Sequence, residues 1–471
     1  MRSRSFRFKA SFLCLSLLLG FCKATNGYNP GDPSTNEYYE TQILKCMLGQ
    51  LAECAVEPST APPTILYKKN LLNSVDFYFG FPGSFNPTVT GAGPVTYSIS
   101  TGALPAGLSF NTSNGQISGT PTATAVLTSF GVTATNTFGN STDTFYISVW
   151  DPSAIPDTGK ATCTDNTGTG TSCAGQDGEF SNIPGFRSYN GPVPHPTYTN
   201  QQASVDMIRG LYWKTCSEGQ ADPTCSGTPT LGDWTWASNV CSNLNVAPGY
   251  AGFTTWRLPT MKELLTLVYL GSSTPLVEST YFPNSGASGY WTSTQNADSS
   301  VQAYAIDFNL GSSMSYNKAS SFAVRCVSGR TMSEPSFVDQ GNGIVLEQGS
   351  QIYFQKCNNG ETYTAGACGT GANTIDWETA VAICDSFVLG GFNWRLPNLD
   401  ELHLLTDYTD TSDPKIYSVF NSTASAAYWT SSSQGGGVQE NQAYANLADT
   451  REMALQTKTN FLYFRCVSSG P

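Results

Sequence analysis

The feature that most constrains the fold is an internal duplication, which covers about residues 205–330 and 345–468. Four cysteines recur in the same order in both copies, at an offset of about 140 residues. Three motifs recur between and beside them: Trp-Arg-Leu-Pro at 256–259 and 394–397, Tyr-Trp-Thr-Ser at 290–293 and 428–431, and Arg-Cys-Val at 325–327 and 465–467. Two copies of one domain are therefore present, so a single fold for all 471 residues is excluded.

The spacing of these cysteines constrains how they pair. Four cysteines in a domain allow three pairings. The first two of each copy lie close together beside Gly-, Asn- and Thr-rich turns, so we expect them to close a hairpin, and the other two then span the domain. The expected pairs are Cys216–Cys225, Cys241–Cys326, Cys357–Cys368 and Cys384–Cys466. A bond that closes a loop of more than 80 residues stabilises a domain by about 4 kcal/mol on chain-entropy grounds. Zinc binding by four free thiols is the alternative, but no Cys-x-x-Cys spacing supports it.

Local patterns predict an α+β domain in each copy. Trp234, Ala237 and Cys241 recur at helical spacing, so one helix carries the long-range cysteine into the core. Thr260 followed by Glu263 is a capping box that opens a second helix, and Asn398 with Glu401 repeats it. Short aromatic or alternating runs at 290–294, 303–308 and 322–327 are typical of strands.

These motifs resemble the Lcl C-terminal domain family, named from a bacterial collagen-like surface adhesin. The second copy also has the opening turn of that family, with Phe337, Asp339 and Gly341 to Gly343. The disulfide placement is similar to that of long-form C-type lectin-like domains. The resemblance implies two C-type lectin-like modules; relatives in the adhesin bind sulfated glycosaminoglycans and form trimers, so an oligomer is a further expectation.

The segment before the repeats, residues 64–150, has no cysteine and many alternating runs, which favours a β-sandwich. Its residues 104–110 and 115–121 resemble the immunoglobulin-like, or cadherin-like dystroglycan-type, domain of bacterial surface proteins. The predicted fold class is therefore multidomain: a β-sandwich followed by two disulfide-stapled α+β C-type lectin-like domains. Calcium binding in some relatives makes Asp76, Asp143 and Asp151 weak candidates here.

The N-terminus has the pattern of an export signal. Four basic residues within 2–9 precede an apolar run at 11–21 that is too short to span a bilayer. Cleavage after Ala24, or lipidation of Cys22, are both consistent with it, although bulky Phe21 stands where a lipoprotein signal has a small residue. The twelve remaining cysteines form an even set that suits an oxidising compartment. We expect an exported protein at the outer membrane, on the cell surface or outside the cell.

The expected organisation has six parts. They are a signal peptide (1–24), a stalk with a Cys46–Cys54 bond (25–63), the β-sandwich (64–150), a linker with a Cys163–Cys173 loop (151–204), and the repeats at 205–330 and 331–471. A net charge of −12 excludes nucleic acid as a partner, and membrane contact is expected only through a lipid anchor. Residues 331–471 carry 6 basic and 15 acidic side chains, a net −9 that repels sulfated polymers.

Candidate catalytic residues are few. The chain has 2 histidines; His195 lies in a Pro-rich linker, His403 is expected on a helix surface, and neither is duplicated. Capping explains Glu263 and Glu401 better than acid–base chemistry does. The duplicated arginines are expected to be structural, by stacking on tryptophan or pairing with carboxylates: Arg257, Arg395, Arg325 and Arg465. We therefore predict no catalytic residue and no cofactor.

The acidic loop with Asp407, Asp410 and Asp413 is a weak calcium candidate, because it lacks the EF-hand spacing. The expected function is that of an exported, non-catalytic bacterial surface protein that binds or adheres to a host or envelope ligand through loops. That ligand is an unidentified protein or glycan, with extracellular matrix among the candidates. The alternatives are an enzyme related to formylglycine-generating oxidases, which needs reactive thiols, and a purely structural envelope protein.

Overall fold

The structure is a computed structural model, and it describes residues 61–91, 93–286, 289–420, 424–435 and 440–470. The predicted signal peptide, the anchor at Cys22, the Cys46–Cys54 bond and most of the stalk lie outside these residues. Within the described ranges, no helix has both the length and the apolar character needed to cross a membrane.

The N-terminal domain consists of strands. They are β1 (Thr64–Leu66), β2 (Ser74–Tyr78), β3 (Gly83–Phe85), β4 (Thr88–Thr90), β5 (Thr96–Thr101), β6 (Leu108–Phe110), β7 (Ile117–Gly119), β8 (Ala125–Asn136) and β9 (Gly139–Trp150). One sheet has the order β2-β9-β8-β5, and a second has the order β3-β7-β6. Alternate residues of β2, β8 and β9, such as Val75, Phe77, Val132 and Ile147, are buried in the core of this domain.

The first repeat is built from two sheets and two short α-helices. One sheet joins β10 (Tyr189–Pro194), β11 (Gln202–Asp206), β12 (Leu211–Lys214) and β16 (Val327–Ser328). The other elements are α3 (Trp234–Asn243), η3 (Tyr250–Gly252), α4 (Met261–Leu265), β13 (Gly289–Gln295), β14 (Gln302–Asp307) and β15 (Ser312–Asn317). The predicted capping box of Thr260 and Glu263 is present at the start of α4. The sheet thus begins at Tyr189, inside the segment that the sequence analysis treats as a linker.

The second repeat has the same order of sheet strands and α-helices, with an added two-stranded hairpin and, within the described residues, no counterpart of η3. Its four-stranded sheet joins β17 (Phe337–Asp339), β18 (Ile344–Glu347), β19 (Ile352–Gln355) and β25 (Val467–Ser468). The other elements are β20 (Tyr363–Thr364), β21 (Ala367–Cys368), α5 (Trp377–Asp385), α6 (Leu399–His403), β22 (Ala427–Ser433), β23 (Gln442–Leu447) and β24 (Glu452–Thr457). Among the described residues strands dominate and the longest α-helix, α3, has ten residues, so this part of the chain is mostly β. The C-type lectin-like assignment stays a prediction.

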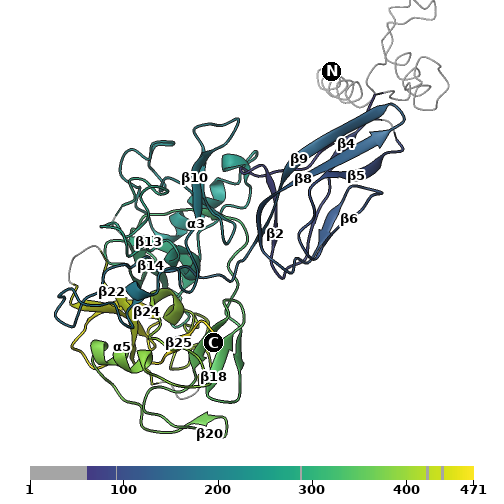
Figure 1. Ribbon diagram of the computed structural model, residues 1–471. Coiled ribbons are helices and arrows are strands. Elements are labelled where there is room, and N and C mark those ends of the chain that lie inside the picture. The colour runs from purple at the N-terminus through teal and green to yellow at the C-terminus, as the bar shows by residue number, and fades with distance from the viewer. Residues whose placement is uncertain (1–60, 92, 287–288, 421–423, 436–439, 471) are drawn as a thin grey trace, which may run out of the picture.

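The two repeats are joined edge to edge. Strands from both form one six-stranded sheet in the order β13-β14-β15-β24-β23-β22, in which Ser313 of β15 pairs with Met453 of β24 (Figure 1). One core contains side chains of both repeats, including Met261 and Leu264 from the first and Leu399 and Met453 from the second. The repeats are therefore one folded unit with an approximate internal two-fold relation, rather than two independent domains.

The β-sandwich is fixed to the first repeat by a polar and aromatic contact. Trp150, at the end of β9, is buried in the same core cluster as Tyr212 of β12. The Tyr212 hydroxyl donates to Asp76 Oδ2 of β2 at 2.6 Å, and the Arg330 guanidinium lies 3.5 Å from the Phe81 ring centre. The sandwich projects from the side of the paired repeats (Figure 1).

Candidate functional site

The described cysteines are all in disulfides. The five bonds are Cys163–Cys173, Cys216–Cys225, Cys241–Cys326, Cys357–Cys368 and Cys384–Cys466. They coincide with five of the six pairs that the sequence analysis expects. In each repeat the long-range bond joins the first helix to the segment just before the last strand, across 85 and 82 residues of chain. Within the described residues no cysteine is left as a thiol.

The duplicated glutamates are held by the duplicated arginines. Arg257 Nη1 and Nη2 donate to the two carboxylate oxygens of Glu263 at 2.6 and 2.7 Å. Arg395 pairs with Glu401 in the same two-pronged way, with Nη1 to Oε2 at 2.5 Å. Both glutamates have no exposed surface, and both also accept the backbone N–H of their own helix cap. Each carboxylate therefore accepts hydrogen bonds from an arginine and from the helix cap, which is the structural role that the capping-box pattern predicts.

The second pair of arginines clamps the hairpin disulfides to the core. Arg325 Nη1 donates to the carbonyl of Lys214 at 2.9 Å, and its Nη2 donates to Ser217 Oγ at 3.0 Å. Arg465 repeats this with the carbonyl of Lys356 at 2.7 Å and with Asn358. Both guanidinium groups are buried beside a disulfide cysteine, so repetition here reflects packing.

The two histidines have different environments. His195 is half-buried, and its Nδ1 accepts the backbone N–H groups of Thr197 and Tyr198 at 3.1 Å. The prediction that His403 lies on an exposed helix face is wrong. It is 2 % exposed, and its Nε2 lies 2.6 Å from the Tyr408 hydroxyl, because the joining of the repeats covers this face of α6. Burial lowers the pKa of His403 to about 3, so the ring is neutral near pH 7.

The acidic loop folds on itself. Asp407 accepts the backbone N–H and hydroxyl of Thr409 at 2.8 and 2.7 Å, and Asp410 accepts the same groups of Ser412. Asp413 lies 3.3 Å from the Lys415 ammonium. Turn formation thus uses these carboxylates, and calcium binding there stays a prediction.

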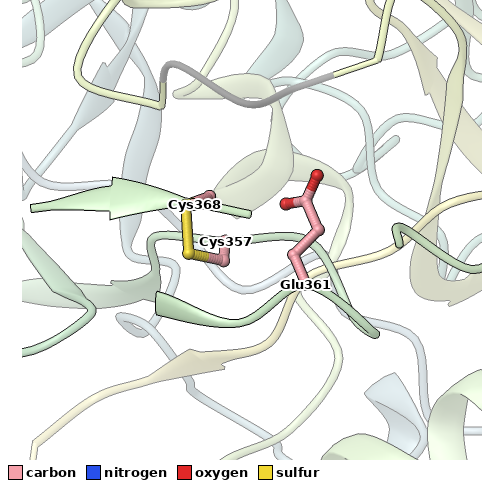
Figure 2. Close-up of side chains that lie close together, drawn as sticks. All are labelled: Cys357, Glu361 and Cys368. Atoms are coloured by element: carbon pink, nitrogen blue, oxygen red, sulfur yellow. A yellow bond between two sulfur atoms is a disulfide. The ribbon is translucent and has the colours of Figure 1, made fainter. Parts of the chain in front are cut away.

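One other group of potential metal ligands occurs within the described residues. It consists of Cys357, Glu361 and Cys368, whose ligand atoms all lie within 4.8 Å of one another (Figure 2). The two sulfur atoms are bonded to each other, so they offer no thiolate to a metal.

A pocket of about 430 Å³, counted with its open mouth, lies where α4 and α6 face each other. Its walls include Lys262, Glu334, Asp400 and His403. Lys262 forms an ion pair with Glu334, whereas Asp400 Oδ2 accepts no hydrogen bond and lies 4.0 Å from the Arg187 guanidinium. Burial raises the pKa of Asp400 to about 7.

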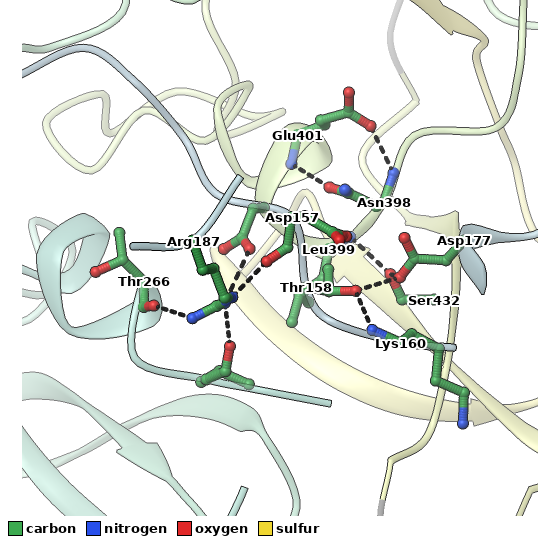
Figure 3. A network of polar contacts seen from close by, with 12 residues as sticks. Asp157, Thr158, Lys160, Asp177, Arg187, Thr266, Asn398, Leu399, Glu401 and Ser432 are labelled. Carbon is green, nitrogen blue, oxygen red and sulfur yellow. Dashed lines mark hydrogen bonds and ion pairs between the residues drawn. The ribbon is translucent and has the colours of Figure 1, made fainter. Parts of the chain in front are cut away.

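The linker ties the two repeats together beside this pocket (Figure 3). Arg187 donates to the carbonyls of Thr266 and Val268, in the first repeat, at 2.7 and 2.5 Å. Asp177 accepts the hydroxyls of Thr158 and of Ser432, in the second repeat, both at 2.6 Å. The linker is therefore a structural strap, and burial raises the pKa of the Asp177 carboxyl to about 6. No sequence motif indicates this role, because Arg187 and Asp177 lie before the duplicated segment.

Two duplicated, disulfide-closed modules behind a β-sandwich are the architecture of a surface or structural protein. The chain belongs to the Lcl C-terminal domain family, whose model matches residues 202–328 and 343–468, more than half of its length. The family model described as "Putative Ig domain" matches residues 63–150. The order of domains expected from the sequence is thus confirmed at family level.

Similar solved structures match only a small part of the chain. A "putative alpha-galactosidase/melibiase" from Bacteroides fragilis is 23 % identical over 20 % of this chain and 19 % of its own, with a TM-score of 0.16. An I-band fragment of titin is 21 % identical over 19 % of this chain and 32 % of its own, also with a TM-score of 0.16. The chain spans about a fifth of the first structure and a third of the second. A search of curated proteins gives no match.

Proposed function

We propose that this chain is an exported bacterial surface protein that binds a host or envelope ligand through the loops of its two repeats, without catalysis. The observation that carries the proposal is that every described cysteine is in a disulfide. In each repeat one bond fixes the first helix to the end of the repeat, and a second bond closes a short loop. Rigid scaffolds that hold loops in place are suited to recognition. The family membership and the immunoglobulin-like domain support a role at a surface.

We also propose that each repeat is a C-type lectin-like module. The support is the bond from the first helix to the end of the repeat, together with the hairpin bond, in both copies. The disulfides are compatible with an exported protein, and placement on the outer membrane or cell surface is part of the proposal.

Exposed apolar side chains on the loops are the candidate contacts. The loop after the first helix exposes a valine in both repeats, Val246 at 75 % and Val388 at 84 %. Phe461 and Val301 are also exposed, near the start of the first helix of the second and first repeats respectively. Apolar groups in such positions contribute to binding when a partner covers them.

The test is an array of matrix proteins and glycans probed with the full mature chain. The proposal predicts saturable binding to at least one member of the array. The variant Val388→Asp, at a side chain that is 84 % exposed, should weaken the binding of any ligand that contacts this loop, and reduction of the disulfides should abolish binding. An array with no bound member would favour the structural envelope protein and contradict the proposal.

A further inference from the structure

Each repeat places a lysine over a tryptophan at the start of its first helix. In the second repeat Lys458 Nζ lies 3.9 Å from the centre of the Trp377 ring, and in the first Lys318 Nζ lies 4.6 Å from that of Trp234. In both, the backbone N–H of the tryptophan donates to the backbone carbonyl of the lysine at 2.9 Å. An aspartate caps the helix just before the tryptophan. The two sites are therefore the same construction.

In the second repeat a loop of the chain itself covers this construction. Lys458 Nζ donates to Thr164 Oγ1 at 2.7 Å, and to the carbonyls of Thr164 and Asp165 at 3.0 and 3.2 Å. Asn166 completes the contact, because its Nδ2 donates to the capping carboxylate of Asp376 at 2.8 Å. Its Oδ1 accepts the backbone N–H of Glu378 at 3.3 Å.

The docked loop is closed by the Cys163–Cys173 bond and seals the site from water. Lys458 and Trp377 both have no exposed surface, and burial lowers the pKa of Lys458 to about 8. The Thr164 hydroxyl also donates to the carbonyl of Glu440 at 3.1 Å. The second repeat thus binds a Thr-Asp-Asn turn by one ammonium, one carboxylate and two backbone groups, and the ammonium itself lies over the Trp377 ring.

In the first repeat no loop of the chain covers the equivalent groups within the described residues. Lys318 is half-buried, and its ammonium donates to the Gln295 side chain at 2.5 Å and to the Ser300 carbonyl at 2.7 Å. The Asp233 carboxylate is exposed, and among the described residues it accepts only the N–H of Trp236. Ser300 holds the position of Glu440, whose carbonyl takes the loop hydroxyl in the second repeat.

We propose that this open site, made of Asp233, Trp234, Lys318 and the Ser300 carbonyl, binds a turn of a partner protein that carries a hydroxyl residue and, two positions later, an asparagine. The Lys318 ammonium then donates to carbonyls of the partner's turn instead of to the Ser300 carbonyl, which in turn accepts the partner's hydroxyl. The partner's asparagine side chain donates to the Asp233 carboxylate and accepts a backbone N–H of the first helical turn. This assigns a partner chemistry to the proposed binding function and rests on that function.

The probe is the disulfide-closed peptide of residues 161–175, labelled for fluorescence anisotropy and titrated with the full mature chain. Because the chain's own loop fills the second site, the free peptide reports on the first. We expect saturable binding of one peptide per chain. Lys318→Ala, and separately Asn166→Ala in the peptide only, should each weaken binding by about tenfold or more, since each removes hydrogen bonds to a charged group. Lys68→Ala, an exposed lysine of the β-sandwich, should leave binding unchanged.

Val301→Glu is a second variant that should leave the fold intact, because the Val301 side chain is 58 % exposed and lies beside Lys318 rather than in the core. It should also weaken peptide binding while the melting temperature is unchanged. Absence of saturable binding, or binding equal in wild type and Lys318→Ala, would overturn the inference. If the array ligand still binds while the peptide does not, the loop site is wrong and the proposed function stands. Self-association that Lys318→Ala abolishes would assign the site to a second copy and also overturn the inference.

Discussion

At the scale of single residues, the charged side chains duplicated between the repeats are structural. Arg395 is 6 % exposed in its side chain and Arg257 is 27 % exposed, yet both meet a glutamate that has no exposed surface. Removing one partner of a buried pair leaves the other charge without compensation. The two pairs share the same two-pronged geometry and differ in how far the arginine is buried.

We predict that Arg395→Ala lowers the free energy of unfolding by about 3–5 kcal/mol. Arg257→Ala should lower the free energy of unfolding by less, because water already reaches the Arg257 guanidinium and can solvate the Glu263 carboxylate once the guanidinium is removed. Urea unfolding of both variants measures the difference. Equal losses, or a larger loss at Arg257, would contradict the burial argument.

The raised pKa of Asp400 predicts a dependence of stability on pH. Burial, the largest cause, raises this pKa to about 7, above the ordinary value near 3.8. The folded state therefore holds a proton that the unfolded state has lost, and this contribution is full below about pH 4 and disappears as pH rises through 7. Asp400→Asn should remove it, so the melting temperature of the variant relative to wild type should rise from pH 4 to pH 7. A constant difference across this range would contradict a buried, protonated Asp400.

At the scale of elements, the sequence predicts what local patterns determine. The helices that carry Cys241 and Cys384, and the two capping boxes, lie where their spacing places them. The joining of β15 to β24 was not predictable, because an edge-to-edge pairing between Ser313 and Met453 leaves no periodic signal in either strand. The burial of His403 follows from that joining and was missed for the same reason.

Substitution of Met453 tests whether the two repeats share one core, and substitution of the exposed Met314 is the control. Met453 has no exposed surface and lies in the core shared by both repeats, whereas Met314, on the partner strand β15, is 45 % exposed. We predict that Met453→Ala lowers the free energy of unfolding by about 2–5 kcal/mol, and Met314→Ala by less than about 1 kcal/mol. Similar effects of the two substitutions in thermal or urea unfolding would argue against a shared core.

At the scale of the whole molecule, charge limits the ligands. The net charge is −12, and residues 331–471 carry −9 of their own. Such a surface repels sulfated polymers, and salt near 0.15 M screens any local attraction beyond about 8 Å. We predict that the mature chain passes through a heparin column at about 0.15 M salt. Retention at that salt would show that a basic patch overrides the net charge and would favour a glycosaminoglycan ligand.

The role of the linker is seen only in the whole molecule. Its sequence predicts a Gly- and Pro-rich spacer, but in the structure Arg187 and Asp177 connect it to both repeats, and its Cys163–Cys173 loop covers Lys458 and Trp377 of the second repeat. Its contacts are with residues far away in the chain and are made largely to backbone carbonyls and single hydroxyls. Such partners are common in every sequence, so no motif marks them.

The proposed function depends most on the disulfides that close each repeat from its first helix to its end and leave no free thiol among the described residues. Mass spectrometry of peptides from the unreduced, exported protein tests this directly. We predict linked peptides for Cys241 with Cys326 and for Cys384 with Cys466, and no alkylated cysteine among residues 61–470. If any of these four cysteines is recovered as a free thiol or linked to a different partner, the proposed scaffold is wrong.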